Sequence, residues 1–263
     1  MQLFYDAACL SVIKSTNQQK VLPKIRRITI SESLRDIEVI FEDNHLLVVN
    51  KPANLLSQGD HTGDEDIQSL FKKWLKEKYQ KPGNVFLGLV QRLDRPTRGL
   101  MVLARTSKSA SRLSEQIRNR TFKKEYLAVV VSRNVKTGLI THQLVKDKAQ
   151  KKAIISDTDQ SGDESGTGSK KAVMEVTHLD TRGALSLIKI NLRTGRFHQI
   201  RAQLAALGMP IAGDSKYGSS KAQIRNLALI SYQLEFIHPT KREKMSFRAQ
   251  VPAEYPWDQF SAY

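Results

Sequence analysis

The chain of 263 residues contains one cysteine and no long apolar run, and both absences limit what the protein can be. The single cysteine, Cys9, excludes a disulfide framework and any zinc or iron–sulfur site built from several cysteines. No run of about 18 apolar residues exists, so the sequence predicts no membrane-spanning helix. We therefore expect a protein without disulfides and without a membrane partner.

The N-terminal residues lack the features of a secretory signal. The first residues, MQLFYDAACLSVIKSTNQQK, have no basic region followed by an apolar one, so we expect a cytoplasmic protein. Residues 7–31 carry basic side chains and no acidic one, which leaves an organellar transit peptide as an alternative to a solvated tail. Residues 1–35 are too short and too poor in core-forming side chains for a domain, and we expect a peripheral extension.

Sequence motifs of several common enzyme classes are also missing. The chain contains no H-E-x-x-H, no G-x-x-x-x-G-K-[ST] and no G-x-S-x-G. Its six histidines are scattered, and no two of them are four residues apart. These absences weaken the interpretations as a metallonuclease, a basic phosphoester hydrolase or a nucleotide hydrolase, and nothing in the sequence points to a metal site.

The chain has a large excess of positive charge. Lysine and arginine number 42 and acidic residues 26, which gives a net charge of +16. Such a surplus predicts a polyanionic partner, with nucleic acid first and an anionic membrane second. A basic protein with no such partner is the alternative. Hydrophobic content of 40% and charged content of 26% are ordinary for a soluble globular protein.

The apolar patterns predict an α+β fold with a mixed or antiparallel sheet. Strand patterns occur in groups with a few helical patterns between them, and a regular βαβ alternation is absent. Residues 156–171, SDTDQSGDESGTGSKK, have no large apolar side chain and predict a flexible polar insertion. Residues 36–263 otherwise form one predicted domain. We expect strands at 37–42, 46–50, 88–90, 99–104, 123–132, 172–180, 184–192 and in a hairpin at 234–252, and helices at 66–79, 107–120 and 197–208.

One acidic residue stands in a basic turn between two apolar segments. In GLVQRLDRPTRGLMVLART, Asp94 lies among arginines, and Pro96 and Gly99 favour a turn. Nearby guanidinium groups favour an ionised carboxylate, so the pKa of Asp94 is expected to fall. An ionised carboxylate can act as a nucleophile or stabilise positive charge. From spacing alone, an ion pair that fastens the turn is the favoured interpretation.

A second group of polar residues surrounds the start of a predicted helix. In LRTGRFHQIRAQLA, Arg193 and Arg196 flank a Thr-Gly turn, and His198 and Arg201 lie on one helix face. Free N–H groups at a helix start together with two arginines would suit a phosphate. A helix with an exposed basic edge explains the same pattern equally well.

Taken together, these segments resemble the RluA-like branch of the RNA pseudouridine synthases. IEVIFEDNHLLVVNKPANLLSQG is similar to the first motif of that family, and RLDRPTRGLMVLART resembles its hallmark R-L-D-R-x-T-x-G-L. KKEYLAVV is similar to the K-x-Y motif, and LRTGRFHQIRAQLAALGMPIAGDSKYG resembles the third motif nearly throughout. LEFIHPTKREKMSFRAQVP matches the usual ending, so the resemblance runs from about Asp36 to about Trp257.

The resemblance implies a reaction and a fold. Members of the family detach uracil from its sugar, rotate it and rejoin it through carbon 5, without a cofactor or metal. The implied fold is a mostly antiparallel mixed sheet with flanking helices and a central cleft. The implied partner is ribosomal or transfer RNA, bound by a monomer through the basic surface of the catalytic domain, because residues 1–35 are too short for a separate RNA-binding domain.

The resemblance also assigns roles to single residues. Asp94 matches the catalytic aspartate, Arg201 the arginine that pairs with it, and Tyr126 the tyrosine that stacks on uracil and assists proton removal. Arg92 matches an arginine that fills the gap left by the flipped nucleotide. The complete set expected to contact RNA or substrate is Lys51, Arg92, Arg95, Arg196, His198 and Gln199.

Two positions depart from the family pattern. Gln91 stands where histidine is common, and Arg98 stands where serine is common. Both adjoin the expected RNA side, so the departures concern RNA contacts rather than catalysis. A non-catalytic RNA-binding protein that kept the fold is the alternative function, and the presence of Asp94, Tyr126 and Arg201 argues against it.

Overall fold

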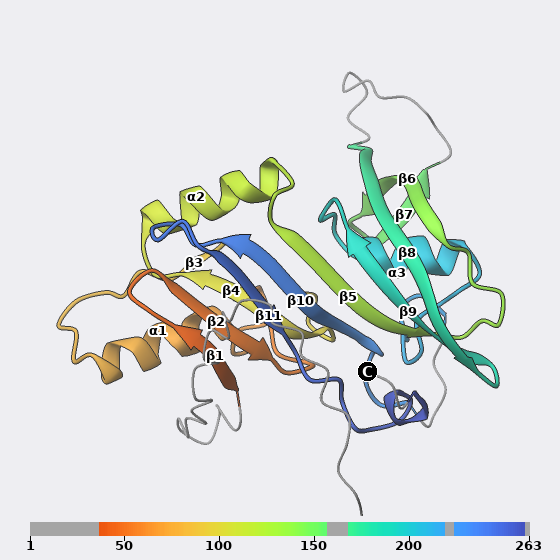
Figure 1. Ribbon diagram of the computed structural model, residues 1–263, viewed down its shortest axis with the longest axis horizontal. Helices are drawn as coiled ribbons and strands as arrows, with labels where there is room; N and C mark the ends of the chain where they lie inside the picture. Colours follow the sequence, from red (N-terminus) through yellow and green to blue (C-terminus); the bar gives the residue numbers. More distant parts are fainter. Residues whose placement is uncertain (1–36, 157–167, 219–223, 261–263) are drawn as a thin grey trace, which may run out of the picture.

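The computed structural model describes residues 37–156, 168–218 and 224–260 (Figure 1). The expected N-terminal extension, residues 1–35, lies outside these ranges, and so does most of the expected polar insertion. Of the residues expected in the insertion, Ser156 is the last residue of one strand, and Lys170 and Lys171 are the first residues of the next.

A single mixed sheet forms the framework of the described fold. Its eleven strands follow the order β1-β2-β4-β10-β5-β9-β8-β6-β7, with β3 also paired to β4 and β11 also paired to β10. The pair of β4 and β10 is parallel, and the other pairs are antiparallel. The α+β expectation is therefore confirmed. The strands are β1 (Glu38–Glu42), β2 (Leu46–Lys51), β3 (Gly88–Leu89), β4 (Arg98–Ala104), β5 (Lys123–Val130), β6 (Gly138–Asp147), β7 (Lys152–Ser156), β8 (Lys170–Arg182), β9 (Leu185–Leu192), β10 (Leu229–Ile237) and β11 (Lys244–Arg248).

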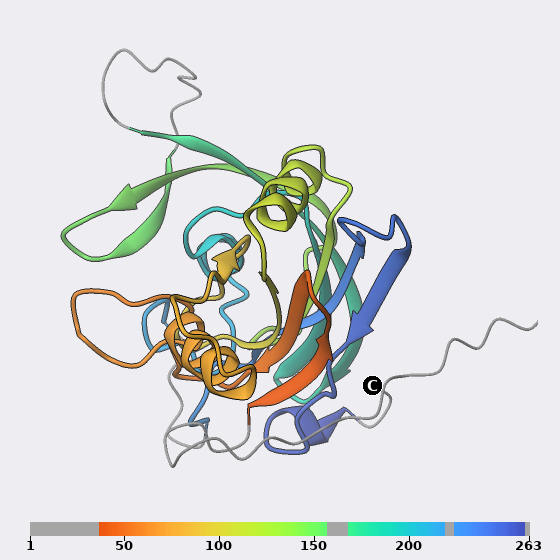
Figure 2. The same cartoon turned by 90° about the vertical axis from the view of Figure 1, so that its left-hand side faces the viewer.

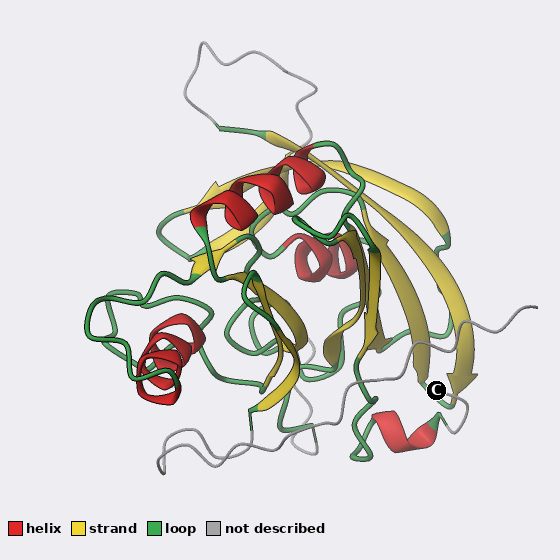
Figure 3. Ribbon diagram, turned by 60° about the vertical axis from the view of Figure 1, so that its left-hand side comes forward, coloured by secondary structure: helices red, strands yellow, loops and turns green. Residues whose placement is uncertain are grey.

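Three α-helices lie on one side of the curved sheet (Figure 3). They are α1 (Ile67–Lys78), α2 (Ser107–Arg118) and α3 (Gln199–Ala206), and a short 3₁₀ helix, η2, covers Trp257–Gln259. The side chain of Asp66 accepts a hydrogen bond from the Ser69 N–H and caps α1, and Thr106 caps α2 in the same way. No described helix is long and apolar enough to cross a membrane.

The two ends of the sheet differ in how deeply they are buried. Strands β2 and β4 are apolar runs buried along almost their whole length, which is typical of strands covered on both faces. Strand β8 instead alternates buried and exposed positions in its first half, as a strand with one solvated face does. In Figure 2, strands β6 and β7 project from the rest of the sheet, and Figure 1 shows them at the end far from α1 and α2.

Strand β10 joins the two ends of the sheet. Its residues Ile230 and Ser231 pair with the start of β4, and its other edge pairs with β5. Gly99 makes the first contact possible, because its φ is +111° and a Cβ there would lie 2.4 Å from the Ser231 carbonyl oxygen. This close approach holds the segment before β4, which carries Asp94, against the centre of the sheet.

Candidate active site

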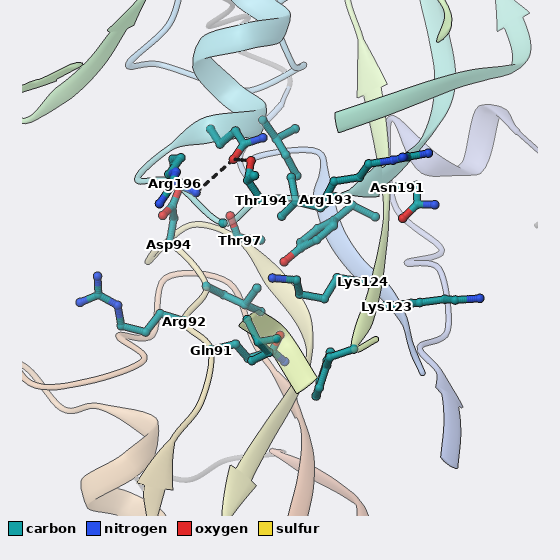
Figure 4. Close-up of a pocket in the computed structure, with 18 of the residues that line it drawn as sticks. Gln91, Arg92, Asp94, Thr97, Lys123, Lys124, Asn191, Arg193, Thr194 and Arg196 are labelled. Atoms are coloured by element: carbon teal, nitrogen blue, oxygen red, sulfur yellow. Dashed lines mark hydrogen bonds between the residues drawn. The ribbon is translucent and has the colours of Figure 1, made fainter. Parts of the chain in front are cut away.

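A cavity of about 660 Å³ lies where the segment before β4, strand β5 and the start of α3 meet (Figure 4). Asp94, Tyr126 and Arg201 all line this cavity. The structure therefore brings together the three residues that the sequence assigned to catalysis, although they come from widely separated segments. Arg92, Arg196, His198 and Gln199 line the same cavity.

Asp94 lies in an irregular segment before β4. The backbone carbonyl of Asp94 accepts a hydrogen bond from the Thr97 N–H at 3.0 Å. Its side chain is 26% exposed, and its Oδ2 lies 3.5 Å from Nη1 of Arg201. Burial raises the pKa of the Asp94 carboxyl, and the charge of Arg201 opposes this shift without cancelling it. The expectation of a lowered pKa is therefore wrong.

Burial is the largest cause of this difference, and a second carboxylate, Asp214, which sequence reasoning did not single out, adds to it. Asp214 is fully buried, and its two oxygens accept hydrogen bonds from Nε and Nη2 of Arg201 at 2.8 and 2.7 Å. Arg201 thus forms its bidentate pair with Asp214 and offers only Nη1 to Asp94. The negative charge of Asp214 also raises the pKa of Asp94.

The Asp214 turn is fixed by its backbone. Oδ1 of Asp214 accepts hydrogen bonds from the N–H groups of Lys216 and Tyr217 at 3.1 and 3.2 Å. The preceding Gly213 has a φ of +77°, and a Cβ there would lie 2.4 Å from the Asn226 carbonyl oxygen. Only glycine fits this position without displacing the neighbouring chain.

Tyr126 lies on β5 and is buried beside the cavity. Burial and the charge of Asp94 raise the pKa of its hydroxyl above the ordinary value. The phenol therefore stays protonated near neutral pH, where it can stack on a base and donate a hydrogen bond.

His198 contacts the Tyr217 hydroxyl and lies beside Asp94. The Tyr217 hydroxyl accepts a hydrogen bond from the Ala153 N–H at 2.7 Å and lies 2.9 Å from Nδ1 of His198. Burial and the charge of Arg201 lower the pKa of His198 to about 3. His198 is therefore neutral, and its Nε2 lies 3.8 Å from Oδ2 of Asp94.

The start of α3 differs from a free phosphate-binding helix end. Oε1 of Gln199 accepts hydrogen bonds from the Thr194 hydroxyl at 2.8 Å and from the Arg196 N–H at 3.0 Å. Arg193 pairs with Glu175 at 3.0 Å, and Nε of Arg196 donates to a backbone carbonyl at 3.0 Å. Several donors that the sequence suggested for a phosphate are thus already engaged.

Lys51 occupies a different place from the one expected. It is fully buried, and its ammonium donates to the carbonyl oxygens of Pro52, Leu55 and Arg95 at 2.9, 2.7 and 3.1 Å. Burial lowers the pKa of Lys51 to about 7. The prediction that Lys51 contacts RNA is corrected, because this side chain is buried and holds the Asp94 segment through its hydrogen bond to the Arg95 carbonyl.

Two further arginines lie outside the residues that line the cavity. Arg95 is exposed and pairs with Asp64 at 2.6 Å. Arg98, the unexplained departure from the family pattern, pairs with Glu254 at 2.6 Å and so ties the start of β4 to the C-terminal segment. Gln91, the other departure, lines the cavity, and both polar atoms of its amide are buried without a hydrogen-bond partner among the described residues.

The described residues hold no group of three or more His, Cys, Asp or Glu side chains that could bind a metal ion. The polar residues that sequence reasoning missed are Asp214, Tyr217 and Lys124. Asp214 and Tyr217 stand in the segment AGDSKYG, where an acid directly after a glycine marks a turn. That signal indicates a turn but does not say which cation the acid pairs with.

The chain is similar to known RNA-modifying proteins. The family model for RNA pseudouridylate synthases matches residues 45–206. Ribosomal large subunit pseudouridine synthase D of Zymomonas mobilis is 32% identical over 233 residues, which cover 83% of this chain and 70% of that protein. The corresponding protein of Neisseria meningitidis serogroup A is 34% identical and covers 82% of this chain, which spans 58% of that relative's length.

Solved structures share the fold. Human RNA pseudouridylate synthase domain containing 4 has a TM-score of 0.65 at 23% identity, over 81% of this chain and 88% of that chain. Human RNA pseudouridylate synthase domain containing 1 has a TM-score of 0.63 at 21% identity, over 85% of this chain and 87% of that one.

Proposed function

Because the chain belongs to the RNA pseudouridylate synthase family, whose reaction is an isomerisation of uridine in RNA, we propose that Asp94 is its catalytic carboxylate. The observation that supports this role is the position of Asp94 in the cavity. Its side chain is partly exposed there, while the pairing of Arg201 with Asp214 leaves the Asp94 oxygens largely free. A carboxylate in this state can act on a substrate atom rather than on the protein.

The reaction breaks the bond between N1 of uracil and C1′ of ribose and forms a bond between C5 and C1′. In the proposal, ionised Asp94 stabilises the electron-poor C1′ as N1 departs, and the nearby charge of Arg201 favours the ionised form. Tyr126 stacks on the detached base, since its raised pKa keeps the phenol neutral. His198 lies beside the Asp94 carboxylate, with its Nε2 3.8 Å from Oδ2.

The target of the proposed enzyme is large-subunit ribosomal RNA, as the names of several relatives suggest. Arg92, Arg118 and Arg120 are exposed, line the cavity and supply a basic approach to it. Arg92 takes the space left by the flipped nucleotide. We propose a monomer that acts in the cytoplasm and captures RNA through this surface.

Tritium release from RNA labelled at carbon 5 of uridine tests the catalytic role, because the C5 hydrogen leaves when C5 joins the sugar. Asp94→Asn is expected to lower the rate by roughly 1,000-fold or more while RNA binding persists. The matched control, Asp180→Asn, changes a carboxylate on β8 that pairs with Arg182 outside the cavity. Ordinary tritium release by Asp94→Asn would remove Asp94 from the mechanism.

The target is tested separately. Pseudouridine mapping of total RNA from cells with and without the gene is expected to show the loss of at least one site in large-subunit ribosomal RNA. Loss of sites in transfer RNA alone would overturn the proposed target and leave the proposed chemistry intact.

A further inference from the structure

Lys124 and its neighbour Lys123 leave strand β5 in opposite directions (Figure 4). Alternate residues of a strand share a face, so Lys124 lies on the same face as Tyr126, about 7 Å along the strand. Lys123 is exposed and lies 4.0 Å from Glu235 on the neighbouring strand. Lys124 instead directs its ammonium into the cavity.

Lys124 is a buried cation without a partner. It is only 9% exposed, and its ammonium makes no hydrogen bond or ion pair with any residue that the structure describes. Burial lowers the pKa of this ammonium. A lysine in this state gains more than an exposed one from an anion that enters the cavity, because the anion supplies the missing interaction in surroundings that shield charge poorly.

The other cations of the cavity wall differ from Lys124 in one of two ways. Lys123, Arg193, Arg196 and Arg201 each have a described partner. The side chains of the remaining three are exposed to solvent and have no ion-pair or hydrogen-bond partner among the residues that the structure describes: Arg92, Arg118 and Arg120.

Lys124 and Gly195 lie side by side on the wall of the cavity. The Lys124 nitrogen lies 3.4 Å from the position that a Cβ of Gly195 would occupy, so it faces a residue without a side chain. The Gly195 N–H donates no hydrogen bond to a described residue. The two neighbours of Gly195 are held by Gln199, which fixes the loop around this N–H.

We propose that Lys124 binds a backbone phosphate of the RNA strand beside the target uridine, on the cavity side of its ammonium and next to the Gly195 N–H. The inference rests on the proposed function, since it takes RNA as the ligand. Uracil and ribose are neutral, and the phosphate is the anion that RNA brings into the cavity. A phosphate held on the face that carries Tyr126 fixes the strand relative to the base that Tyr126 stacks on.

The salt dependence of RNA binding tests the charge of the contact. The probe is an in vitro transcript of large-subunit ribosomal RNA, and the variants are Lys124→Met, Lys124→Arg and the control Lys244→Met. Lys244 is exposed on β11, outside the cavity, and pairs with the same Glu235 as Lys123. One lost phosphate contact is expected to reduce the slope of log affinity against log salt by roughly 0.7–0.9 in Lys124→Met.

Lys124→Arg preserves the charge, so it shows whether an effect of Lys124→Met comes from the lost charge or from altered structure. Lys124→Arg is expected to keep the wild-type slope, and Lys124→Met is expected to lower kcat/KM by roughly 10- to 100-fold, as for one charge-assisted hydrogen bond. Unchanged slopes in both variants, or equal loss of slope in Lys124→Arg and Lys124→Met, would overturn the proposal.

Single methylphosphonate substitutions locate the phosphate in a short synthetic RNA that the wild-type protein modifies. One neutralised phosphate next to the target uridine is expected to weaken the wild type and to have no further effect in Lys124→Met. Additive effects at every phosphate would contradict the assignment. If wild type and Lys244→Met bind RNA but form no pseudouridine, the proposed function fails, and the salt slopes still decide whether Lys124 meets a phosphate.

Discussion

The Asp94 turn, which precedes β4, and the Asp214 turn, which follows α3, present the same kind of side chain to the same guanidinium. Asp214 is fully buried and accepts four hydrogen bonds, two from Arg201 and two from backbone N–H groups. Asp94 is 26% exposed and has a single longer contact with Arg201. A buried carboxylate that accepts several hydrogen bonds from the protein holds structure, whereas one that is left under-bonded can act on a ligand.

The largest expected effect follows from breaking the Asp214 turn. Asp214→Asn leaves Arg201 without its bidentate partner in a buried place, and we expect the free energy of unfolding to fall by roughly 3–5 kcal/mol. Urea denaturation monitored by circular dichroism measures this change. Asp94→Asn is the matched variant, and its unfolding free energy should not fall below that of the wild type. Equal losses in the two variants would contradict the division of roles.

Lys51→Met tests what holds the Asp94 turn in place. The substitution removes a buried donor from three carbonyl groups, one of which belongs to Arg95 next to Asp94. We expect a loss of roughly 1–3 kcal/mol in unfolding free energy and a lower kcat, with RNA affinity and its salt slope unchanged. A reduced salt slope instead would restore Lys51 as an RNA contact.

The pH dependence of stability and of kcat tests the raised pKa of Asp94 in the first turn. Since its folded pKa is raised, the folded protein binds more protons than the unfolded chain between the unfolded and folded values. Its contribution to stability therefore grows as pH falls through the folded pKa, while the ionised, active form disappears. We expect kcat to fall about tenfold per pH unit below that value, starting above the ordinary carboxylate range.

The stability of Asp94→Asn provides the control for this pH effect. At neutral pH the variant should melt at a higher temperature than the wild type, and the gap should close as pH falls. A gap that widens toward acidic pH would mean that the pKa of Asp94 is lowered, as first expected from the arginines around it.

The smallest expected effect concerns the outer face of the Asp94 turn. Arg95 pairs with Asp64, and both side chains are close to half exposed. Arg95→Gln should change the unfolding free energy by less than about 1 kcal/mol, because exposed ion pairs contribute little. A thermal melt at low and high salt checks this. A loss as large as that of Lys51→Met would mean that the exposed pair of Arg95 and Asp64 holds the turn as firmly as buried Lys51 does.

Local sequence pattern predicted much of the sheet, because apolar alternation and turn residues act over short distances. The two strands that meet before Leu185 and the strands around Asp94 follow this logic. Strands β6 and β7 were missed. GLITHQLVKD and KAIIS show no clear alternation, and their burial comes from packing beside β8 and α3.

The site was predictable only in part for a related reason. Family likeness indicated Asp94, Tyr126 and Arg201, and the structure places them around one cavity. The pKa direction could not be predicted by counting arginines, because burial and the competing Asp214 decide it. The position of Lys51 depends on carbonyl groups from separate loops, which no local pattern specifies.

The position of strand β10 in the sequence determines when the sheet can be completed during synthesis. It lies between β4 and β5, yet it follows both of them in the sequence. Protein synthesis proceeds at roughly 5–20 residues per second, so β4 and β5 leave the ribosome before β10 does. The two strands cannot take their final places until β10 lies between them. The cavity between the Asp94 turn and β5 can therefore close only after residues 229–237 have been made. A growing chain reaches a finished active site late, so an unfinished copy has little chance to modify RNA close to where it is being synthesised.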